Sequence, residues 1–171
     1  MELNKAKEIA EDLKGRLEIG CEKIVVAGSI RRQKPEVGDI ELLVIPKLSG
    51  EIDRLSEAIV DLMVQEILGY RLNKRGSRMY GTKNKLMVHL PSSIGVDIFS
   101  TDAQCWAVSL VVRTGGKITN QRIATAALRK GWHFRAYGDG FDTPDGHITC
   151  STEQEVFEYV GLRYLEPWER E

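Results

Sequence analysis

The chain has 171 residues and a formal net charge of −1, so it is not coated with basic residues for binding nucleic acid. This length allows one domain or two small lobes with a real core. Cys21, Cys105 and Cys150 are widely spaced and include no CxxC pair, which argues against a disulfide framework or a zinc site. The charged N-terminus lacks a signal core, and no apolar run reaches membrane-spanning length. We therefore expect a soluble cytoplasmic protein with no membrane contact.

Helices and strands alternate along the first part of the chain. Apolar residues recur at helical spacing over 3–17, which predicts an amphipathic helix. Short segments rich in β-branched residues, 24–27 and 40–45, are typical of strands. Helical spacing returns over 50–68, with Gly69 as the expected stop. Two further strands are predicted at 86–90 and 95–99.

The remaining residues predict a second, smaller unit. Residues 104–112 and 119–130 have helical patterns and are separated by a glycine-containing turn. Gly-Asp and Asp-Gly pairs within 138–147 predict hairpins. We interpret the acids of this segment, Asp139, Asp142 and Asp145, as a surface turn, because they lack the spacing of a calcium loop. A capping box led by Ser151 predicts a short helix near the C-terminus.

Two acids lie at the start of the strand predicted at 40–45. Asp39 directly precedes this strand, and Glu41 is its second residue. Side chains alternate between the faces of a strand, so Asp39 and Glu41 project from one face. Two carboxylates there need compensation, which a divalent cation with oxygen ligands would supply. If strand 95–99 lies alongside, Asp97 adds a third carboxylate, and three such groups can hold two Mg²⁺ ions. The alternative is that Asp97 faces water.

A Gly-Ser turn follows the first predicted strand and leads into two arginines. Backbone N–H groups at such a turn can cradle an anion, and Ser29 adds a hydroxyl donor. Arg31 and Arg32 have the planar fork that suits a phosphate. Taken alone, this motif is more often a solvated corner than a phosphate site. The two acids that follow it favour the phosphate site.

Residues 70–85 contain six basic residues and no acid. They form either a solvated basic loop or a footprint for a nucleic-acid backbone, and the residues alone favour neither. The six are Arg71, Lys74, Arg75, Arg78, Lys83 and Lys85.

Four segments together resemble the palm and thumb of the family X DNA polymerases, the group that includes DNA polymerase beta. Residues 27–46 resemble the family's GS-x-RR and GD-x-D motifs, and 96–99 the strand with its third metal-binding aspartate. Residues 113–132 resemble the thumb segment that opens with Thr-Gly, and 155–171 the C-terminal helix and tail. The resemblance implies an α+β fold. A nucleotidyltransferase palm with a mixed β-sheet and flanking helices would occupy 1–103, and a small α/β thumb 104–171.

The resemblance also implies roles for the matching positions. Asp39, Glu41 and Asp97 fall on the positions that bind two Mg²⁺ ions, for which Mn²⁺ could substitute. The basic residues of 71–85 fit the palm edge that faces the primer strand. The positions expected to bind the nucleotide are Gly28, Ser29, Arg32, Gly38, Thr114, Gly115, Lys117 and Asn120.

Several positions depart from the family pattern. Glu41 replaces the usual aspartate, Val112 and Arg113 replace an aromatic pair, and Ala124 replaces an arginine that contacts the template. Only about 20 residues precede the first strand, so we expect neither the lyase domain nor the fingers. The chain thus resembles the minimal viral members, which have only a palm and a thumb.

The sequence therefore predicts a DNA-directed DNA polymerase that adds dNTPs to a primer 3′-hydroxyl, by two-metal nucleotidyl transfer and in gap-filling repair. Its partners would be gapped or primed DNA and a dNTP. We expect a monomer in the cytoplasm, or in the host-cell cytoplasm if a phage or virus encodes it. Two alternatives stay open: a nucleotidyltransferase acting on RNA, protein or a small molecule, and a catalytically weakened nucleic-acid binding protein.

Overall fold

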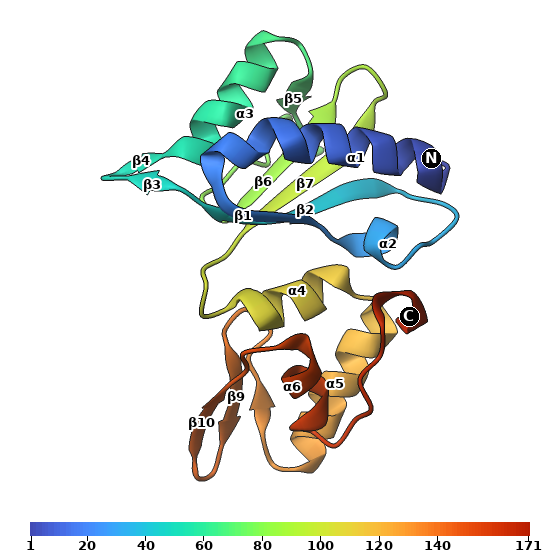
Figure 1. Ribbon diagram of the computed structural model, residues 1–171, viewed down its shortest axis with the longest axis vertical. Coiled ribbons are helices and arrows are strands. Elements are labelled where there is room, and N and C mark those ends of the chain that lie inside the picture. The colour runs from blue at the N-terminus through green and yellow to red at the C-terminus, as the bar shows by residue number, and fades with distance from the viewer.

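A computed structural model describes all 171 residues, which form two lobes stacked end to end (Figure 1). The N-terminal lobe runs from α1 to β7, and the C-terminal lobe from α4 to the last residue. Each lobe has its own hydrophobic cluster. None of the helices combines the length and the apolar character needed to cross a bilayer.

The N-terminal lobe is built on a five-stranded mixed sheet in the order β1-β2-β7-β6-β5. Within this sheet β2 and β7 are parallel, and the other neighbours are antiparallel. The predicted mixed sheet and α+β class are confirmed. The strands are β1 (Cys21–Val26), β2 (Asp39–Pro46), β5 (Leu68–Tyr70), β6 (Asn84–His89) and β7 (Ile94–Ser100).

Two helices cover one face of this sheet, as Figure 1 shows. Helix α1 (Leu3–Leu17) leads through the short 3-10 turn η1 (Glu18–Gly20) into β1, and α3 (Arg54–Val64) lies beside it. Ile40, Leu42 and Val44 of β2 are fully buried against them. Because side chains alternate along a strand, Asp39 and Glu41 project from the opposite face, toward the C-terminal lobe.

The helix predicted over 50–68 is shorter than expected. Residues 48–53 form a small hairpin of β3 (Leu48–Ser49) and β4 (Ile52–Asp53). Helix α3 begins only at Arg54, because the Asp53 side chain accepts hydrogen bonds from the N–H groups of Leu55 and Ser56. The helix ends at Val64, and Gly69 lies within β5 instead of terminating the helix.

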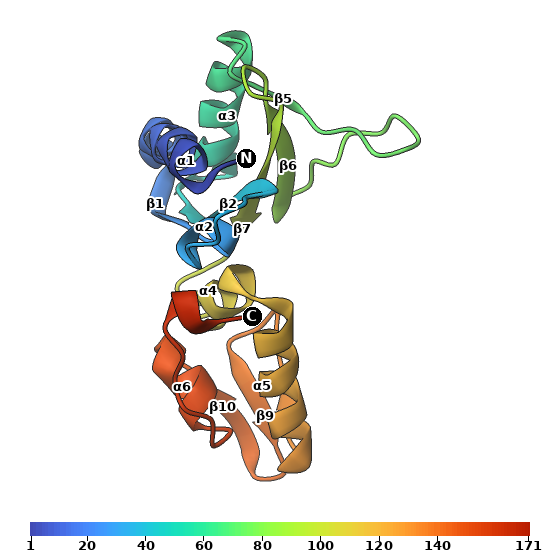
Figure 2. The ribbon, with the colours of Figure 1, turned by 90° about the vertical axis from the view of Figure 1, so that its right-hand side faces the viewer.

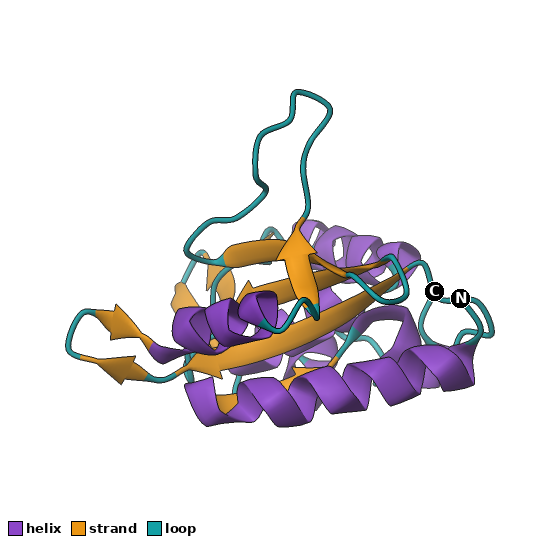
Figure 3. Cartoon of the chain, turned by 90° about the horizontal axis from the view of Figure 1, so that it is seen from above, coloured by secondary structure: helices purple, strands orange, loops and turns teal.

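A long loop between β5 and β6, which we call the arm (residues 71–83), extends away from the sheet. Figure 2 and Figure 3 show it projecting well beyond the rest of the lobe. Its turn is stabilised by Asn73, whose side-chain oxygen accepts hydrogen bonds from the N–H groups of Arg75 and Ser77. The arm therefore presents its side chains to solvent on a structured turn.

The C-terminal lobe packs helices against a three-stranded antiparallel sheet in the order β10-β9-β8. Phe141 and Phe157 are buried at its centre, and Phe134 stacks near Phe141. The predicted hairpins and helices of this region are present, but the helix that begins at Glu153 is capped by Thr152 instead of Ser151. The elements are α4 (Trp106–Thr114), α5 (Lys117–Arg129), β8 (His133–Phe134), β9 (Gly140–Thr143), β10 (Gly146–Thr149), α6 (Glu153–Glu158) and η2 (Pro167–Glu169).

An ion-pair network connects the two lobes. Arg31 contacts both carboxylate oxygens of Glu153 in α6, with distances of 2.6 and 2.9 Å, and also donates to Thr114 Oγ1 at 2.7 Å. Arg170, which is fully buried, pairs with the same Glu153 at 2.9 Å. Burial alone would raise the pKa of Glu153, but the two arginines hold it below its usual value. This acid is therefore ionised and links the lobes.

All three cysteines are free thiols. Burial raises the pKa of Cys21 and Cys105 to about 11 and that of Cys150 to about 12. They remain protonated at neutral pH, and a thiol is a weak nucleophile and metal ligand.

Candidate active site

Three carboxylates project from the face of the sheet that looks toward the C-terminal lobe. The parallel register of β2 and β7 sets Glu41 directly opposite Asp97, and Asp39 opposite Gly95. Asp39 shares its face with Glu41 because the two are separated by one residue. The juxtaposition predicted from the sequence is therefore present.

The protonation of Glu41 reflects this crowding. Burial and the nearby charges of Asp39 and Asp97 raise the pKa of Glu41 to about 7, against the partial opposition of Arg32 and Arg113. Burial also raises the pKa of Asp97, although the adjacent Arg71 opposes the shift. Acids that are costly to ionise together are those that a divalent cation would stabilise most.

Glycine at position 28 makes room for Glu41. Gly28 begins the single helical turn α2 (Gly28–Arg31) with a positive φ of 60°, and the Glu41 carboxylate occupies the space that a Cβ would fill. Any side chain at position 28 would collide with this carboxylate and adopt a strained backbone conformation. Because glutamate is longer than the aspartate usual at this position, the carboxyl group of Glu41 reaches the Gly-Ser turn.

Two buried donors beside this turn have no hydrogen-bond partner. They are the hydroxyl of Ser29 and the Nε of Arg32. Buried polar groups in proteins are nearly always hydrogen-bonded, so unpaired ones need an explanation. A phosphate bound at the turn would accept from both. The predicted phosphate-binding role of Ser29 and Arg32 fits this arrangement.

Arg32 also reaches the turn between α4 and α5. Its Nη1 donates to the backbone carbonyl of Thr114 and lies close to Gly115. The side chain of Thr114 is buried and accepts from Arg31. The Gly-Ser turn and the Thr-Gly turn, which are far apart in the sequence, therefore lie side by side, and the peptide bond between Gly115 and Gly116 is cis.

The other predicted nucleotide-binding positions differ in their environment. Gly38 is exposed just before β2, and Lys117 is exposed at the start of α5. Asn120 points back toward α4, where its side-chain amide donates to the Val112 carbonyl at 3.0 Å. Its Oδ1 is buried without a partner. Asn120 must therefore turn away from α4 before its amide can contact a base.

The predicted DNA-binding residues do not all lie on the arm's surface. Lys74, Arg75, Arg78 and Lys83 are exposed, and the guanidinium of Arg78 stacks 4.2 Å above the ring of Tyr70. The other two of the six predicted residues are not exposed on the arm. Lys85 is buried, donates to the Thr82 carbonyl at 2.7 Å and lies 3.3 Å from Asp53. Arg71 points into the carboxylate site, where its Nη2 lies 2.7 Å from Asp97 Oδ1.

One cation of this site was not among the predicted residues. Arg113, near the end of α4, places its guanidinium 3.6 Å above the ring of Phe99, and Tyr137 lies beyond it. Its charge lowers the pKa of both Glu41 and Asp97. The sequence showed that Arg113 replaces an aromatic residue of the family pattern. It did not show that Arg113 would contact Phe99. Three arginines, Arg32, Arg71 and Arg113, therefore surround the three acids.

The residues present have the chemistry of a Mg²⁺ site, although their oxygens are not gathered together. Hard divalent cations bind carboxylate oxygens, and Asp97 Oδ1 is buried without a hydrogen bond. No group of three acidic, histidine or cysteine side chains converges closely enough to form a ready-made metal site. Glu41 reaches toward Gly28, and Asp97 is paired with Arg71. The donors fit the metal, and metal binding requires these side chains to rearrange.

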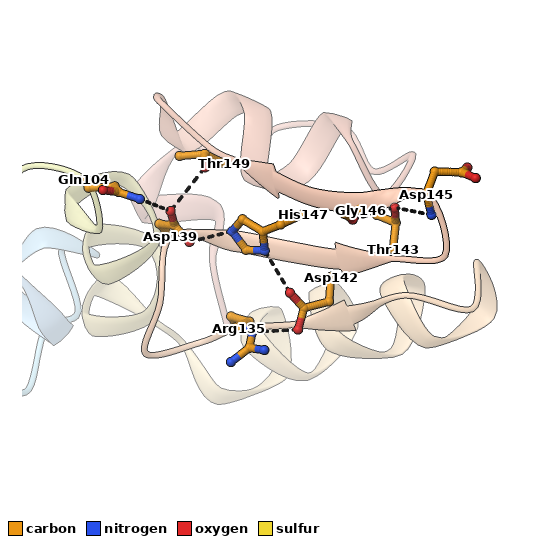
Figure 4. A network of polar contacts seen from close by, with 9 residues as sticks. All are labelled: Gln104, Arg135, Asp139, Asp142, Thr143, Asp145, Gly146, His147 and Thr149. Carbon is orange, nitrogen blue, oxygen red and sulfur yellow. Dashed lines mark hydrogen bonds and ion pairs between the residues drawn. The ribbon is translucent and has the colours of Figure 1, made fainter.

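A second polar cluster lies in the C-terminal lobe, away from the carboxylates (Figure 4). The two ring nitrogens of His147 contact Asp139 at 2.7 Å and Asp142 at 2.8 Å. Asp139 also accepts from Thr149 and from Gln104, which precedes α4. Asp139 is only 9% exposed, so its assignment to a surface turn is wrong. The cluster attaches the β9–β10 hairpin to the start of α4.

The C-terminal lobe also matches a known family. Residues 109–171 match the family model of the DNA polymerase beta thumb, a span from within α4 to the C-terminus. This match supports a relationship to the family X DNA polymerases. It includes the Thr-Gly turn that Arg32 contacts. The chain has no match among curated proteins.

Proposed function

We propose that this protein is a DNA polymerase of the family X type, which transfers a nucleotide from a dNTP to the 3′-hydroxyl of a primer. The observation that carries this proposal is the register of β2 and β7, which sets Glu41 opposite Asp97 beside Asp39. Residues 109–171 of the same chain match the DNA polymerase beta thumb, and this match favours a DNA polymerase over other nucleotidyltransferases. A DNA partner and a role in filling gaps are part of the proposal.

Each part of the site has a task in this reaction. Asp39, Glu41 and Asp97 would hold two Mg²⁺ or Mn²⁺ ions, which lower the pKa of the 3′-hydroxyl and neutralise the charge on the phosphates. The Gly28–Ser29 turn and Arg32 bind the β- and γ-phosphates through donors that otherwise lack partners. The Thr114–Gly115 turn lies beneath the nucleotide sugar.

The substitution Asp97→Asn tests the proposal. We expect wild-type protein to extend the primer in a gapped duplex when supplied with dNTPs and Mg²⁺ or Mn²⁺. Asp97→Asn should reduce the rate more than about 100-fold, equivalent to about 2.7 kcal/mol of lost transition-state stabilisation. Asp61→Asn, an exposed acid in α3, is the matched control and should extend at the wild-type rate.

Other outcomes distinguish the alternatives. Incorporation of labelled nucleotide into RNA or into the protein itself, with none into the gap, would identify a different nucleotidyltransferase. DNA binding without any incorporation would identify a nucleic-acid binding protein on this fold. Extension by Asp97→Asn at the wild-type rate would remove Asp97 from the proposed catalytic set.

A further inference from the structure

Arg71 occupies the carboxylate site from an unexpected direction. It is the first residue of the arm, and its Nη2 lies 2.7 Å from Asp97 Oδ1. The side chain of Arg71 is 27% exposed and that of Asp97 is 13% exposed, so this ion pair is largely shielded from water. This oxygen is buried and, apart from the ion pair with Arg71, has no hydrogen-bond partner. The contact is close but incompletely satisfied.

The space that Arg71 fills exists because residue 95 is glycine. Gly95 lies two residues before Asp97 on β7 and therefore on the same face, opposite Asp39. A Cβ at this position would collide with Arg71 Nη2 and lie next to the Cβ of Asp39. The guanidinium thus lies over Gly95 and against Asp97. A cation held by Asp97 would compete with this guanidinium for the same carboxylate oxygen.

The backbone of Arg71 is held at the base of the arm by two hydrogen bonds. Its N–H donates to the Leu86 carbonyl at 3.2 Å, and its carbonyl accepts from Met79 at 2.9 Å. Beyond it the arm carries four exposed cations. These are Lys74, Arg75, Arg78 and Lys83. A nucleic-acid backbone bound along the arm would therefore pass close to Arg71.

A phosphate and a carboxylate compete for the same guanidinium. Both offer oxygen pairs that match the arginine fork, and both form charge-assisted contacts of similar strength. Exchange of Asp97 for a phosphate would conserve the ion pair of Arg71. It would also release Asp97 Oδ1, an oxygen suited to a hard divalent cation.

We propose that Arg71 is a gate on the metal site, which pairs with Asp97 in the free protein and is drawn away by a backbone phosphate of the bound nucleic acid. The gate rests on the proposed metal-binding function of the three acids. It explains why Asp97 is paired with an arginine in the free protein. Metal binding at Asp97 would then follow nucleic-acid binding.

Mn²⁺ binding to the nucleic-acid-free protein, measured by the electron paramagnetic resonance signal of unbound Mn²⁺, tests the gate. We expect Arg71→Gln to bind Mn²⁺ about tenfold more tightly than wild type. Gly95→Ala should tighten binding similarly, because its Cβ displaces the guanidinium without removing a charge. Arg16→Gln, which removes an exposed cation of α1 on the opposite face of the sheet, should leave the affinity unchanged.

A gapped duplex without dNTP provides the second half of the test. Once Mn²⁺ binding to DNA alone has been subtracted, wild-type affinity should rise to that of Arg71→Gln, and Arg71→Gln should change little. Wild-type affinity in both Arg71→Gln and Gly95→Ala would overturn the gate. If Asp97→Asn also weakened Mn²⁺ binding in that case, the proposed metal site would stand without the gate. Absence of Mn²⁺ binding in every protein would overturn both proposals.

Discussion

At the scale of single residues, Glu41 determines the electrostatics of the site. Its pKa is raised to about 7 by burial and by Asp39 and Asp97, so the ionised form is disfavoured in the metal-free protein. An unfolded glutamate has a pKa near 4.5. Protonated Glu41 therefore contributes stability that is fully present below pH 4.5 and lost as the pH rises through 7.

Glu41→Gln should remove this pH-dependent cost. In the presence of EDTA, the free energy of unfolding of Glu41→Gln should exceed that of wild type by about 2–3 kcal/mol at pH 8 and by much less at pH 5. Urea unfolding at the two pH values measures the difference. Glu8→Gln, an exposed acid in α1, is the control and should show no such pH dependence. Equal differences at both pH values would contradict the raised pKa.

At the scale of elements, the arm combines nucleic-acid contacts with a structural anchor. The combined substitution of Lys74 and Arg75 by glutamine should weaken binding to gapped DNA several-fold. It should also reduce the slope of log affinity against log salt by about 0.9 for each lost phosphate contact, or about 1.8 for both. Binding titrations at several salt concentrations test this expectation. An unchanged slope would show that the arm tip does not contact the DNA backbone.

Lys85 belongs to the same basic segment but should behave differently. It is 1% exposed and contacts Thr82 and Asp53, the residue that caps α3. Lys85→Gln should lower the free energy of unfolding by about 1–3 kcal/mol, because it leaves buried groups without their partner. The salt dependence of DNA binding should stay the same. A reduced slope with unchanged stability would restore Lys85 to the DNA-binding surface.

Local patterns in the sequence were sufficient to predict which acids share a face of the sheet. They were insufficient to predict the side chains that surround these acids. Alternation along β2 predicted that Asp39 and Glu41 share a face, because strand periodicity is local. Asp97 was expected beside them only if its strand lay alongside, which is the register that β2 and β7 have. The partners of Arg71 and Lys85 were not predicted, because the direction of a long side chain depends on distant residues, here Asp97 and Asp53. The start of α3 was misplaced because a hairpin of four strand residues precedes it with little signal of its own.

At the scale of the whole molecule, an ion pair of one acid, Glu153, connects the two lobes. Glu153 lies between Arg31 of the N-terminal lobe and Arg170 near the C-terminus. The sequence could not predict this network, because Arg31 and Glu153 are 122 residues apart. Arg31 adjoins Arg32, which contacts the Thr-Gly turn. The network therefore positions the phosphate-binding turn of one lobe against the nucleotide-binding turn of the other.

Glu153 at the centre of this network and Arg31 at one end of it should differ in their contribution to stability. Glu153→Gln leaves two arginines without a counter-ion, and one of them, Arg170, is fully buried, so the free energy of unfolding should fall by about 3–5 kcal/mol. Arg31→Gln should cost less, because Arg31 is 24% exposed and Glu153 keeps its pair with Arg170. Urea unfolding of both variants measures the order. If Arg31→Gln were the more destabilising variant, the contact between the lobes, and not the buried Arg170, would dominate the network.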